Sequence, residues 1–324
     1  MYNYVFFASN ADYLEVAYSD IFSFSNVYYQ KEFLYHPTLL TKTMFMIHYS
    51  SKINSIVKLP FKKLWYSKHF SKKHFHNDNK YIFTFFYNWN RVFDSGYIEF
   101  LKKHFTGCKC VLFLQDINNA NKLNIEKEKN RFDHVMVFEK NFAKKHNIEY
   151  YPLVYSEGLK DVYFEQRPFD LTFIGRAKGR YDLIKAINKR IRDEGLKGCF
   201  YLSGIDKPDG DDISDGINFV KYISYEDTIR ILKQSKCILD IVPNNKNCNT
   251  LRSNEAIIYG TKLLTNNPYI TEEPYYDPKY ISIYSTPNDI DIKFLKNWSS
   301  IPRYKNSESI SPISLLNHLN KLFQ

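Results

Sequence analysis

The stretch Asp170-Leu-Thr-Phe-Ile-Gly-Arg-Ala-Lys-Gly-Arg180 decides the fold. Its first five residues are mostly apolar or β-branched, which predicts a short buried strand that ends at a glycine. In residues 181–193, which follow, Ile184, Ile187 and Ile191 recur on one face of an expected helix. A strand, a glycine-containing turn and a helix in this order are typical of the opening unit of a parallel α/β domain.

The same alternation continues to the C-terminus. Further strands are expected at Cys199–Leu202, Ile217–Val220, Cys237–Val242, Leu263–Thr265 and Ile281–Tyr284. Helices are expected around Tyr225–Leu232, over Leu251–Tyr259 with a stop at Gly260, and over Leu315–Leu322. This half therefore reads as one complete parallel α/β domain.

The first half carries a similar but weaker pattern. Strands are expected at Tyr4–Ala8, Tyr81–Tyr87, Cys110–Leu114 and Val135–Phe138, and a helix over Asp94–His104. Residues 10–80 show little periodicity. Residues 152–168 have mixed polarity with proline at both ends, which indicates a connection between halves.

The 324 residues are thus expected to form two Rossmann-like α/β domains facing across a cleft. The boundaries that we expect are 1–155 for the first domain, 156–310 for the second, and 311–324 for a helix that packs back on the first.

Composition constrains the partners and the compartment. The formal net charge is +10 and the pI is near 9.1, so the chain attracts anionic partners. No apolar run reaches the about 18–20 residues of a spanning helix, and the N-terminus lacks the pattern of a secretory signal. The odd number of cysteines, five, fits a reducing cytoplasm, and Cys108 and Cys110 are expected to be buried free thiols rather than metal ligands.

A basic and aromatic segment lies between Lys58 and Lys80. Five lysines and five aromatic residues are interleaved there, and Asp78 is the only acid. These ten residues are Phe61, Lys62, Lys63, Trp65, Tyr66, Lys68, Phe70, Lys72, Lys73 and Phe75. A solvated surface and a peripheral contact with an anionic membrane both fit this pattern. No nucleic-acid motif accompanies it, so we expect no nucleic-acid partner.

The turn after the first strand of the second half carries candidate binding residues. Gly175 and Gly179 allow the backbone to approach a ligand closely, and amides at a helix start point toward an anion. Arg176, Lys178 and Arg180 add three cations within five residues. A diphosphate would fit there, and a basic turn exposed to water fits equally well. The turn matches neither a Walker loop nor the dinucleotide fingerprint.

A second candidate lies at the start of the helix over Leu251–Tyr259. Thr250 can cap this helix, and Arg252 and Glu255 are three residues apart, so they share one helix face. The carboxylate could accept hydrogen bonds from sugar or ribose hydroxyls, and the arginine could neutralise a phosphate. A surface ion pair is the alternative reading.

These segments together resemble a known family. A strand, Gly175-Arg-Ala-Lys-Gly-Arg180, a helix, and later Arg252-Ser-Asn-Glu-Ala256 with Gly260 before a strand are similar to the C-terminal domain of GT-B fold glycosyltransferases. The similarity is greatest to the bacterial group of lipopolysaccharide and capsular polysaccharide synthesis, and it spans about residues 80–300.

The resemblance implies a nucleotide-sugar donor in the second domain and an acceptor in the first. The donor-binding residues it implies are Gly175, Arg176, Lys178, Gly179, Arg180, Tyr222, Thr250, Arg252 and Glu255. Many GT-B enzymes carry two glutamates about seven residues apart in the second region, whereas here Cys248 stands seven before Glu255. This departure puts a two-carboxylate scheme in doubt.

Catalysis would require charge stabilisation and a base. GT-B enzymes usually need no metal, so no cofactor or metal is expected, and Asp209-Gly-Asp211 reads as a turn rather than a metal motif. Asp116, at the end of a strand, is our candidate base, with helix capping as its alternative role. His48 is a second candidate.

The expected activity is transfer of a hexose from a nucleoside-diphosphate sugar to a glycan or lipid-linked glycan acceptor of bacterial surface polysaccharide. The expected place is the cytoplasm, including the inner face of the membrane. A sugar-nucleotide epimerase and a non-catalytic nucleotide-sugar-binding subunit remain open as alternatives.

Overall fold

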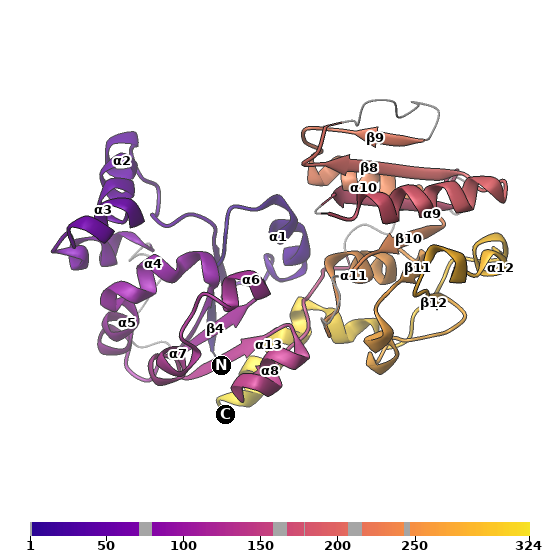
Figure 1. Cartoon of the computed structure of the whole chain (residues 1–324). Coiled ribbons are helices and arrows are strands. Elements are labelled where there is room, and N and C mark those ends of the chain that lie inside the picture. The colour runs from indigo at the N-terminus through magenta and orange to yellow at the C-terminus, as the bar shows by residue number, and fades with distance from the viewer. Residues whose placement is uncertain (1, 71–79, 158–166, 178, 207–215, 243–246) are drawn as a thin grey trace. The chain divides into compact units, whose positions relative to one another are not determined.

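The computed structural model describes residues 2–70, 80–157, 167–177, 179–206, 216–242 and 247–324. The chain forms two compact units, one of Met1–Pro152 with Pro312–Gln324 and one of Leu153–Ser311 (Figure 1). We call these unit 1 and unit 2. Each unit contains a six-stranded parallel sheet with helices, so the prediction of two Rossmann-like α/β domains is confirmed.

The sheet of unit 1 has the order β2-β1-β3-β4-β5-β6. Its strands are β1 (Asn3–Phe7), β2 (Val27–Gln30), β3 (Tyr81–Phe86), β4 (Lys109–Leu114), β5 (His134–Val137) and β6 (Glu149–Tyr150). All six residues of β3 are buried, as expected of a parallel strand covered on both faces. The strand order reverses between β1 and β3, and the carboxyl ends of strands at such a switch point are where doubly wound sheets bind ligands.

The helical elements of unit 1 include three short turns and one π-helical segment. The helices are α1 (Asp12–Ala17), α2 (Leu39–His48), α3 (Ser51–Ile56), α4 (Asn90–Val92), α5 (Ile98–His104), α6 (Ile117–Ala120), α7 (Ile125–Arg131), α8 (Lys140–His146) and α13 (Pro312–Leu322). The shorter segments are η1 (Ser19–Ile21), η2 (Lys62–Lys68), η3 (Tyr87–Trp89) and η4 (Phe93–Tyr97). The single helix expected over Asp94–His104 is wrong at its start, because Gly96 adopts a φ of +94° and kinks the chain there.

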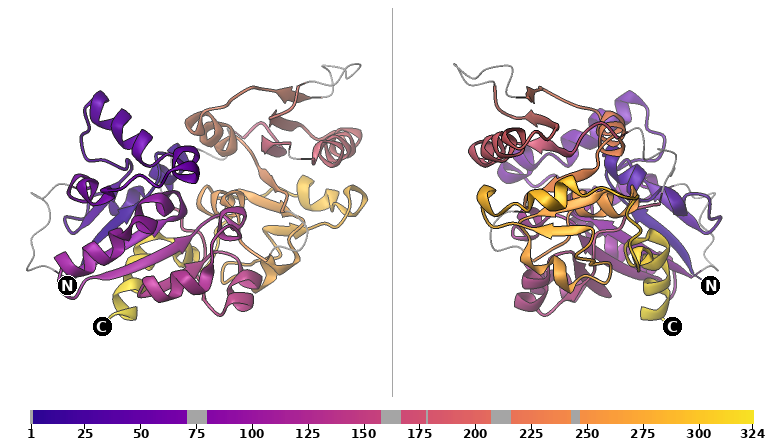
Figure 2. Two further views of the ribbon diagram at one scale, coloured as in Figure 1. Left: turned by 60° about the vertical axis from the view of Figure 1, so that its left-hand side comes forward. Right: turned by 90° about the vertical axis from the view of Figure 1, so that its right-hand side faces the viewer.

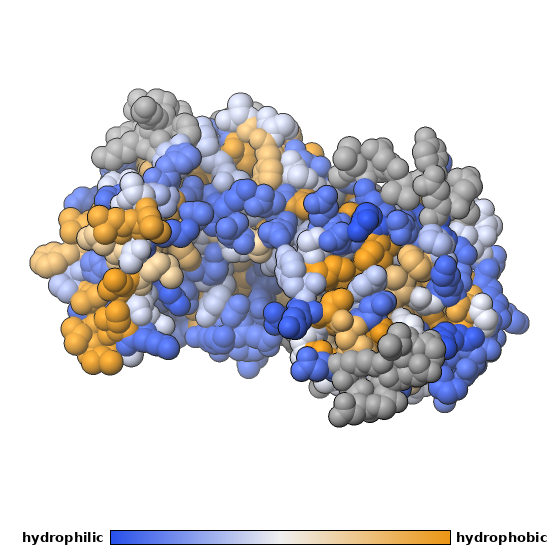
Figure 3. Space-filling view, turned by 90° about the horizontal axis from the view of Figure 1, so that it is seen from above, coloured by the Kyte–Doolittle hydropathy of each residue, from blue (hydrophilic) through white to orange (hydrophobic). Residues whose placement is uncertain are grey.

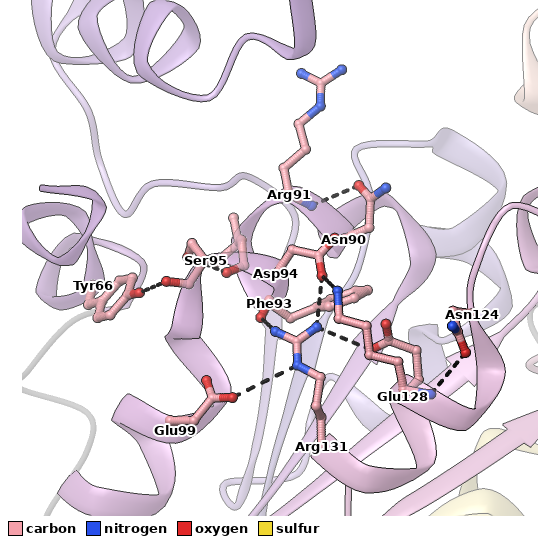
Figure 4. A network of polar contacts seen from close by, with 12 residues as sticks. Tyr66, Asn90, Arg91, Phe93, Asp94, Ser95, Glu99, Asn124, Glu128 and Arg131 are labelled. Atoms are coloured by element: carbon pink, nitrogen blue, oxygen red, sulfur yellow. Dashed lines mark hydrogen bonds and ion pairs between the residues drawn. The ribbon is translucent and has the colours of Figure 1, made fainter. Parts of the chain in front are cut away.

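An ion-pair network holds this kinked segment (Figure 4). Arg131, at the end of α7, contacts Asp94 at 2.8 Å and the buried carboxylate of Glu128 at 3.3 Å, and it also donates to the Phe93 carbonyl. From the other side, the Tyr66 hydroxyl donates to the Ser95 carbonyl. The network therefore fastens η2 and α7 to the same irregular turn.

The last helix completes unit 1. Leu315, Leu316 and Leu319 of α13 are buried, and the Tyr4 hydroxyl of β1 donates to the Leu316 carbonyl at 3.3 Å. The Tyr2 hydroxyl donates to the Phe323 carbonyl at 3.0 Å. Both views in Figure 2 show α13, in yellow, beside the N-terminal elements.

The sheet of unit 2 has the order β12-β11-β10-β7-β8-β9. Its strands are β7 (Leu171–Arg176), β8 (Gly198–Ser203), β9 (Ile217–Phe219), β10 (Cys237–Asp240), β11 (Lys262–Thr265) and β12 (Ile281–Ile283). Read from β9, this is the strand order of the dinucleotide-binding Rossmann fold, and its switch point lies between β7 and β10.

The helices of unit 2 agree closely with the sequence pattern. They are α9 (Tyr181–Asp193), α10 (Tyr225–Lys233), α11 (Leu251–Ile258) and α12 (Ile292–Lys296), with shorter turns η7 (Pro268–Glu272), η8 (Pro287–Asp289) and η9 (Ser307–Ile310). Ile184, Ile187 and Ile191 of α9 are fully buried against the sheet. Gly260 follows α11 with a φ of +57°, which confirms the expected stop.

Three expectations about composition can also be assessed. Cys108 and Cys110 are buried free thiols, as expected. Among the residues that the structure describes, no helix is both long enough and apolar enough to span a bilayer. In the segment from Lys58 to Lys80, however, Trp65, Tyr66 and Phe70 are buried in unit 1, so the expectation that these rings form a surface is wrong.

Candidate functional site

The candidate site lies at the switch point of unit 2, where β7 and β10 end side by side. Ile238 of β10 pairs with Thr172 of β7, and the chain then leaves the two strands in different directions. α9 begins after β7, and α11 begins after β10, so two helix starts lie near the carboxyl ends of these strands. Helix starts present unpaired amides, which favour anions.

Arg252 of α11 reaches across this switch point. Its Nε and Nη2 atoms donate to the Ile174 carbonyl of β7 at 3.2 and 3.0 Å, and its Nη1 donates to Glu255. Thr250 caps α11 by accepting a hydrogen bond from the Ser253 amide, as expected. The three bonds of Arg252 engage three of its five donors, so two remain for a ligand.

Glu255 is fully buried and joins this arginine to a chain of hydroxyl groups. The Tyr225 hydroxyl donates to Oε1 of Glu255 at 2.6 Å, and the Tyr155 hydroxyl lies 2.8 Å from that of Tyr225 and 2.5 Å from that of Tyr259. Burial, together with the Glu255 carboxylate, raises the pKa of Tyr225 well above its usual range. Burial alone would lower the pKa of Arg252, but the adjacent carboxylate raises it, so the arginine stays charged. The pair is therefore a buried ion pair rather than the surface pair that the sequence left open.

Arg180 makes the reciprocal connection. From the start of α9 it donates through Nη1 to the Ile241 carbonyl after β10 at 2.6 Å, and through Nη2 to the Arg176 carbonyl at 2.8 Å. Its guanidinium also lies 5.5 Å from the centre of the Phe173 ring. Burial lowers the pKa of this arginine. Arg180 thus joins the ends of β7 and β10, and Arg252 joins α11 to β7.

Asp240, the last residue of β10, is a site residue that the sequence analysis did not select. It is 4% exposed, and burial raises its pKa to about 6 against partial opposition from hydrogen bonds of Thr250 and Thr265. An acidic residue at the end of an apolar run was the available signal, because strand ends gather ligand groups in such sheets.

The other residues that were expected to bind the sugar donor lie in different environments. Gly175 and Arg176 end β7, and the Arg176 side chain is exposed. Gly179 forms the following turn with a φ of +74° and nothing within 4 Å of its Cβ position, which leaves room for a ligand. Lys178 lies outside the described residues. Tyr222 is 73% exposed before α10, and the hydroxyl that reaches Glu255 belongs instead to Tyr225.

The candidate base lies in unit 1. Asp116 is exposed at the end of β4 and caps α6, where its Oδ1 accepts from the Asn118 amide at 2.8 Å. Its alternative role as a helix cap is therefore present, and its role as a base stays a prediction. His48 accepts a hydrogen bond from Trp65 at its Nδ1 and contacts the Pro60 carbonyl with its Nε2, so both of its ring nitrogens make structural contacts.

The described part of unit 2 therefore offers an anion two free donors of Arg252, the exposed Arg176 and two helix starts. Within the residues described, no group of three His, Cys, Asp or Glu side chains has the spacing of a metal site. Asp209-Gly-Asp211 lies outside the described residues.

Comparisons with known proteins show the fold. No protein-family model matches the sequence, and no curated protein matches it either. Among solved structures, an α-glucosyltransferase in complex with UDP-glucose and DNA containing an abasic site has a TM-score of 0.50 and 10% identity, over 81% of this chain and 79% of that chain. This similarity identifies the fold as that of GT-B glycosyltransferases.

Two further solved structures are similar over more of the chain. A UDP-forming α,α-trehalose-phosphate synthase from Burkholderia xenovorans has a TM-score of 0.46 and 9% identity, over 91% of this chain and 89% of that chain. The DNA-modifying enzyme β-glucosyltransferase has a TM-score of 0.43 and 14% identity, over 99% of this chain and 95% of that chain.

Proposed function

We propose that the chain is a metal-independent glycosyltransferase that moves a sugar from a nucleoside-diphosphate sugar bound at the switch point of unit 2. The observation that carries the proposal is the Arg252–Glu255 pair, which spans β7 and α11 and keeps two arginine donors available. The fold supports it, because a solved structure with this fold binds UDP-glucose. UDP is therefore the first nucleotide to test.

The proposed chemistry follows from charge. When the bond between sugar and diphosphate breaks, negative charge develops on the leaving phosphate, and fixed cations stabilise that charge without reorganising. Arg252 is positioned for this role because Ile174 and Glu255 hold its guanidinium plane in place. Arg176 and the amides at the start of α9 would supply further positive potential.

The acceptor is the finer part of the proposal. We assign the chain to bacterial surface polysaccharide synthesis, with a glycan or lipid-linked glycan as acceptor at the inner face of the membrane. Asp116 of unit 1 would take the proton of the acceptor hydroxyl. Two of the similar solved structures are described with DNA, so nucleic acid is the competing acceptor, and our expectation of none stays a prediction.

The test is thermal stabilisation by UDP, GDP, CMP and dTDP, followed by assays of the matching nucleotide sugars. A nucleotide at about 100 times its Kd should stabilise the protein by about 2.7 kcal/mol. Arg176→Ala and Glu255→Gln should reduce this shift, whereas Arg230→Ala, an exposed arginine of α10, should not. The absence of any shift in the wild type would contradict the donor site.

The alternatives give different products. An epimerase would convert the donor without an acceptor, and a binding subunit would show neither hydrolysis nor transfer. A transferase should release nucleotide slowly from the donor alone and faster when its acceptor is added.

A further inference from the structure

A large apolar surface covers α2, α3 and the segment that follows them. Ten of the eighteen exposed large hydrophobic side chains of the described residues lie there: Leu39, Leu40, Met44, Met46, Ile47, Ile53, Ile56, Val57, Phe61 and Leu64. We call this set the α2–α3 surface. In Figure 3 one broad hydrophobic area lies at the left, the side on which Figure 1 labels α2 and α3. Exposed apolar patches of this kind mark interaction sites.

The two helices expose the residues that surface helices normally bury. α2 has ten residues, of which only Phe45 is buried, and α3 has no buried residue at all. Ile56 is 86% exposed and Leu39 is 83% exposed. A helix usually turns its apolar stripe toward the core, so these apolar side chains lack a partner within the described chain.

Charge identifies the partner. From Phe33 to Asn77 the sequence contains no aspartate or glutamate and eight lysines: Lys42, Lys52, Lys58, Lys62, Lys63, Lys68, Lys72 and Lys73. The first six lie among the described residues. A second copy of the chain would bring lysines against lysines, which is unfavourable. An anionic lipid surface offers both the negative headgroups and the apolar interior that this combination requires.

The α2–α3 surface is also held in shape before any partner arrives. The Trp65 indole donates to Nδ1 of His48 at 2.7 Å, so Nε2 of His48 carries the proton that it donates to the Pro60 carbonyl at 2.5 Å. Asn54 of α3 donates to the His48 carbonyl at 2.9 Å. These bonds join α2, α3 and the segment before η2. Few parts of this surface would therefore have to become ordered on docking.

We propose that the α2–α3 surface docks on an anionic bilayer, with its apolar side chains at the headgroup boundary and its lysines among the phosphates. The membrane contact therefore centres on residues 39–64, which include Phe61, and not on Trp65, Tyr66 and Phe70, which are buried. This inference is independent of the donor site, because docking requires no nucleotide.

The test is flotation of the purified full chain with vesicles of phosphatidylcholine alone and with an equimolar mixture of phosphatidylcholine and phosphatidylglycerol. Wild type should float with the mixed vesicles and far less with phosphatidylcholine alone, and added salt should weaken binding. The apolar variant Leu40→Ser with Ile56→Ser and Leu64→Ser should bind at least about tenfold more weakly. All three positions are more than two-thirds exposed, so folding should be unaffected, and circular dichroism checks this.

Two variants that each replace three lysines by glutamate complete the test. Lys52→Glu with Lys58→Glu and Lys63→Glu should weaken binding at least about 100-fold, because each lysine near an anionic surface contributes about fivefold. The matched control is Lys103→Glu with Lys144→Glu and Lys145→Glu. It changes the net charge equally at exposed positions elsewhere in unit 1 and should retain most of the binding.

Three results would overturn the proposal. The wild type could fail to float with the mixed vesicles. The two triple-lysine variants could lose binding equally, which would indicate attraction by net charge alone. The apolar variant could keep its vesicle binding and instead abolish a dimer seen by light scattering, which would assign the surface to a second copy of the chain.

Discussion

The two switch points of this protein are built alike but carry different charge. In unit 1, Trp89 and Asn88 after β3 donate to the Ala8 carbonyl after β1, at 2.5 and 3.0 Å. In unit 2, Arg180 after β7 donates to the Ile241 carbonyl after β10, and Arg252 of α11 donates to the Ile174 carbonyl of β7. Both pairs fasten strands that part from each other, but only the arginines add positive charge.

The difference shows how one architecture can serve two kinds of ligand. A neutral cross-link satisfies the free carbonyl groups at a strand end but adds no positive electrostatic potential that would attract an anion. A cationic cross-link satisfies the same carbonyls and has donors to spare, because a guanidinium has five N–H groups. We therefore expect phosphate chemistry at the edge of unit 2 and hydroxyl chemistry at the edge of unit 1.

The substitution with the largest expected effect removes the cation Arg252 from the switch point of unit 2, which we call the charged edge. Arg252→Ala should lower the free energy of unfolding by about 3–5 kcal/mol, because it leaves the buried Glu255 uncompensated. It should also abolish stabilisation by nucleotide. Urea denaturation with and without nucleotide measures both effects.

The control for this substitution is Arg230→Ala. Arg230 and Asp227 form an ion pair three residues apart at 2.7 Å, but both side chains are exposed. Its loss should leave the free energy of unfolding nearly unchanged, because water and salt screen an exposed pair. Equal effects of the two substitutions would show that the charged edge is an ordinary surface.

The second test concerns unit 1, where Asp116 follows β4. Asp116→Asn keeps an efficient helix cap but removes the base, so turnover should fall by about 10²–10⁴-fold with little change in stability. Steady-state kinetics and thermal unfolding separate the two quantities. An unchanged kcat would leave Asp116 as a cap only.

A third test uses the buried acid of unit 2. The pKa of Asp240 is raised from 3.8 to about 6, so the folded protein holds this proton more tightly than the unfolded chain does. Stability should therefore fall by about 3 kcal/mol as the pH rises through that interval. Urea denaturation across this range should show the fall in wild type and a flatter profile in Asp240→Asn. Parallel profiles would contradict the assignment.

The smallest test uses an acid of unit 1 with the opposite behaviour. Partial burial would raise the pKa of Glu149, but hydrogen bonds from His134 and His318 lower it to about 2. The contribution of Glu149 to the free energy of unfolding is present above pH 4.5 and is lost as the pH falls toward 2. Because Glu149 is partly exposed, Glu149→Gln should cost only about 1 kcal/mol at neutral pH. No loss at neutral pH would assign the attachment of α13 to its leucines alone.

Much of unit 2 could be predicted from the sequence, because its strands β10 and β11 are fully buried and α9 has a regular apolar face. Residues 10–80 could not, because α2 and α3 expose their apolar residues and the periodicity rule assumes burial. The alternation of lysine with Trp65, Tyr66 and Phe70 looked like a surface, but these rings pack inward.

The candidate site was predictable in type and less so in detail. Spacing placed Arg252 and Glu255 on one face, and strand ends placed Arg176 near them. Spacing could not show that Arg180 donates its hydrogen bonds to backbone carbonyls, nor that Tyr225 rather than Tyr222 donates to Glu255. Such contacts depend on residues about 30 to 60 positions away in the sequence.

The position of α13 sets the order in which the protein can mature on the ribosome. Unit 2 is one continuous segment, Leu153–Ser311, whereas unit 1 is built from segments on both sides of it, Met1–Pro152 and Pro312–Gln324. Domains generally fold as units during synthesis, the N-terminal one first. Here we expect the reverse, because the leucines of α13 emerge after all of unit 2, and a nascent chain lacking them would expose the part of unit 1 that they cover.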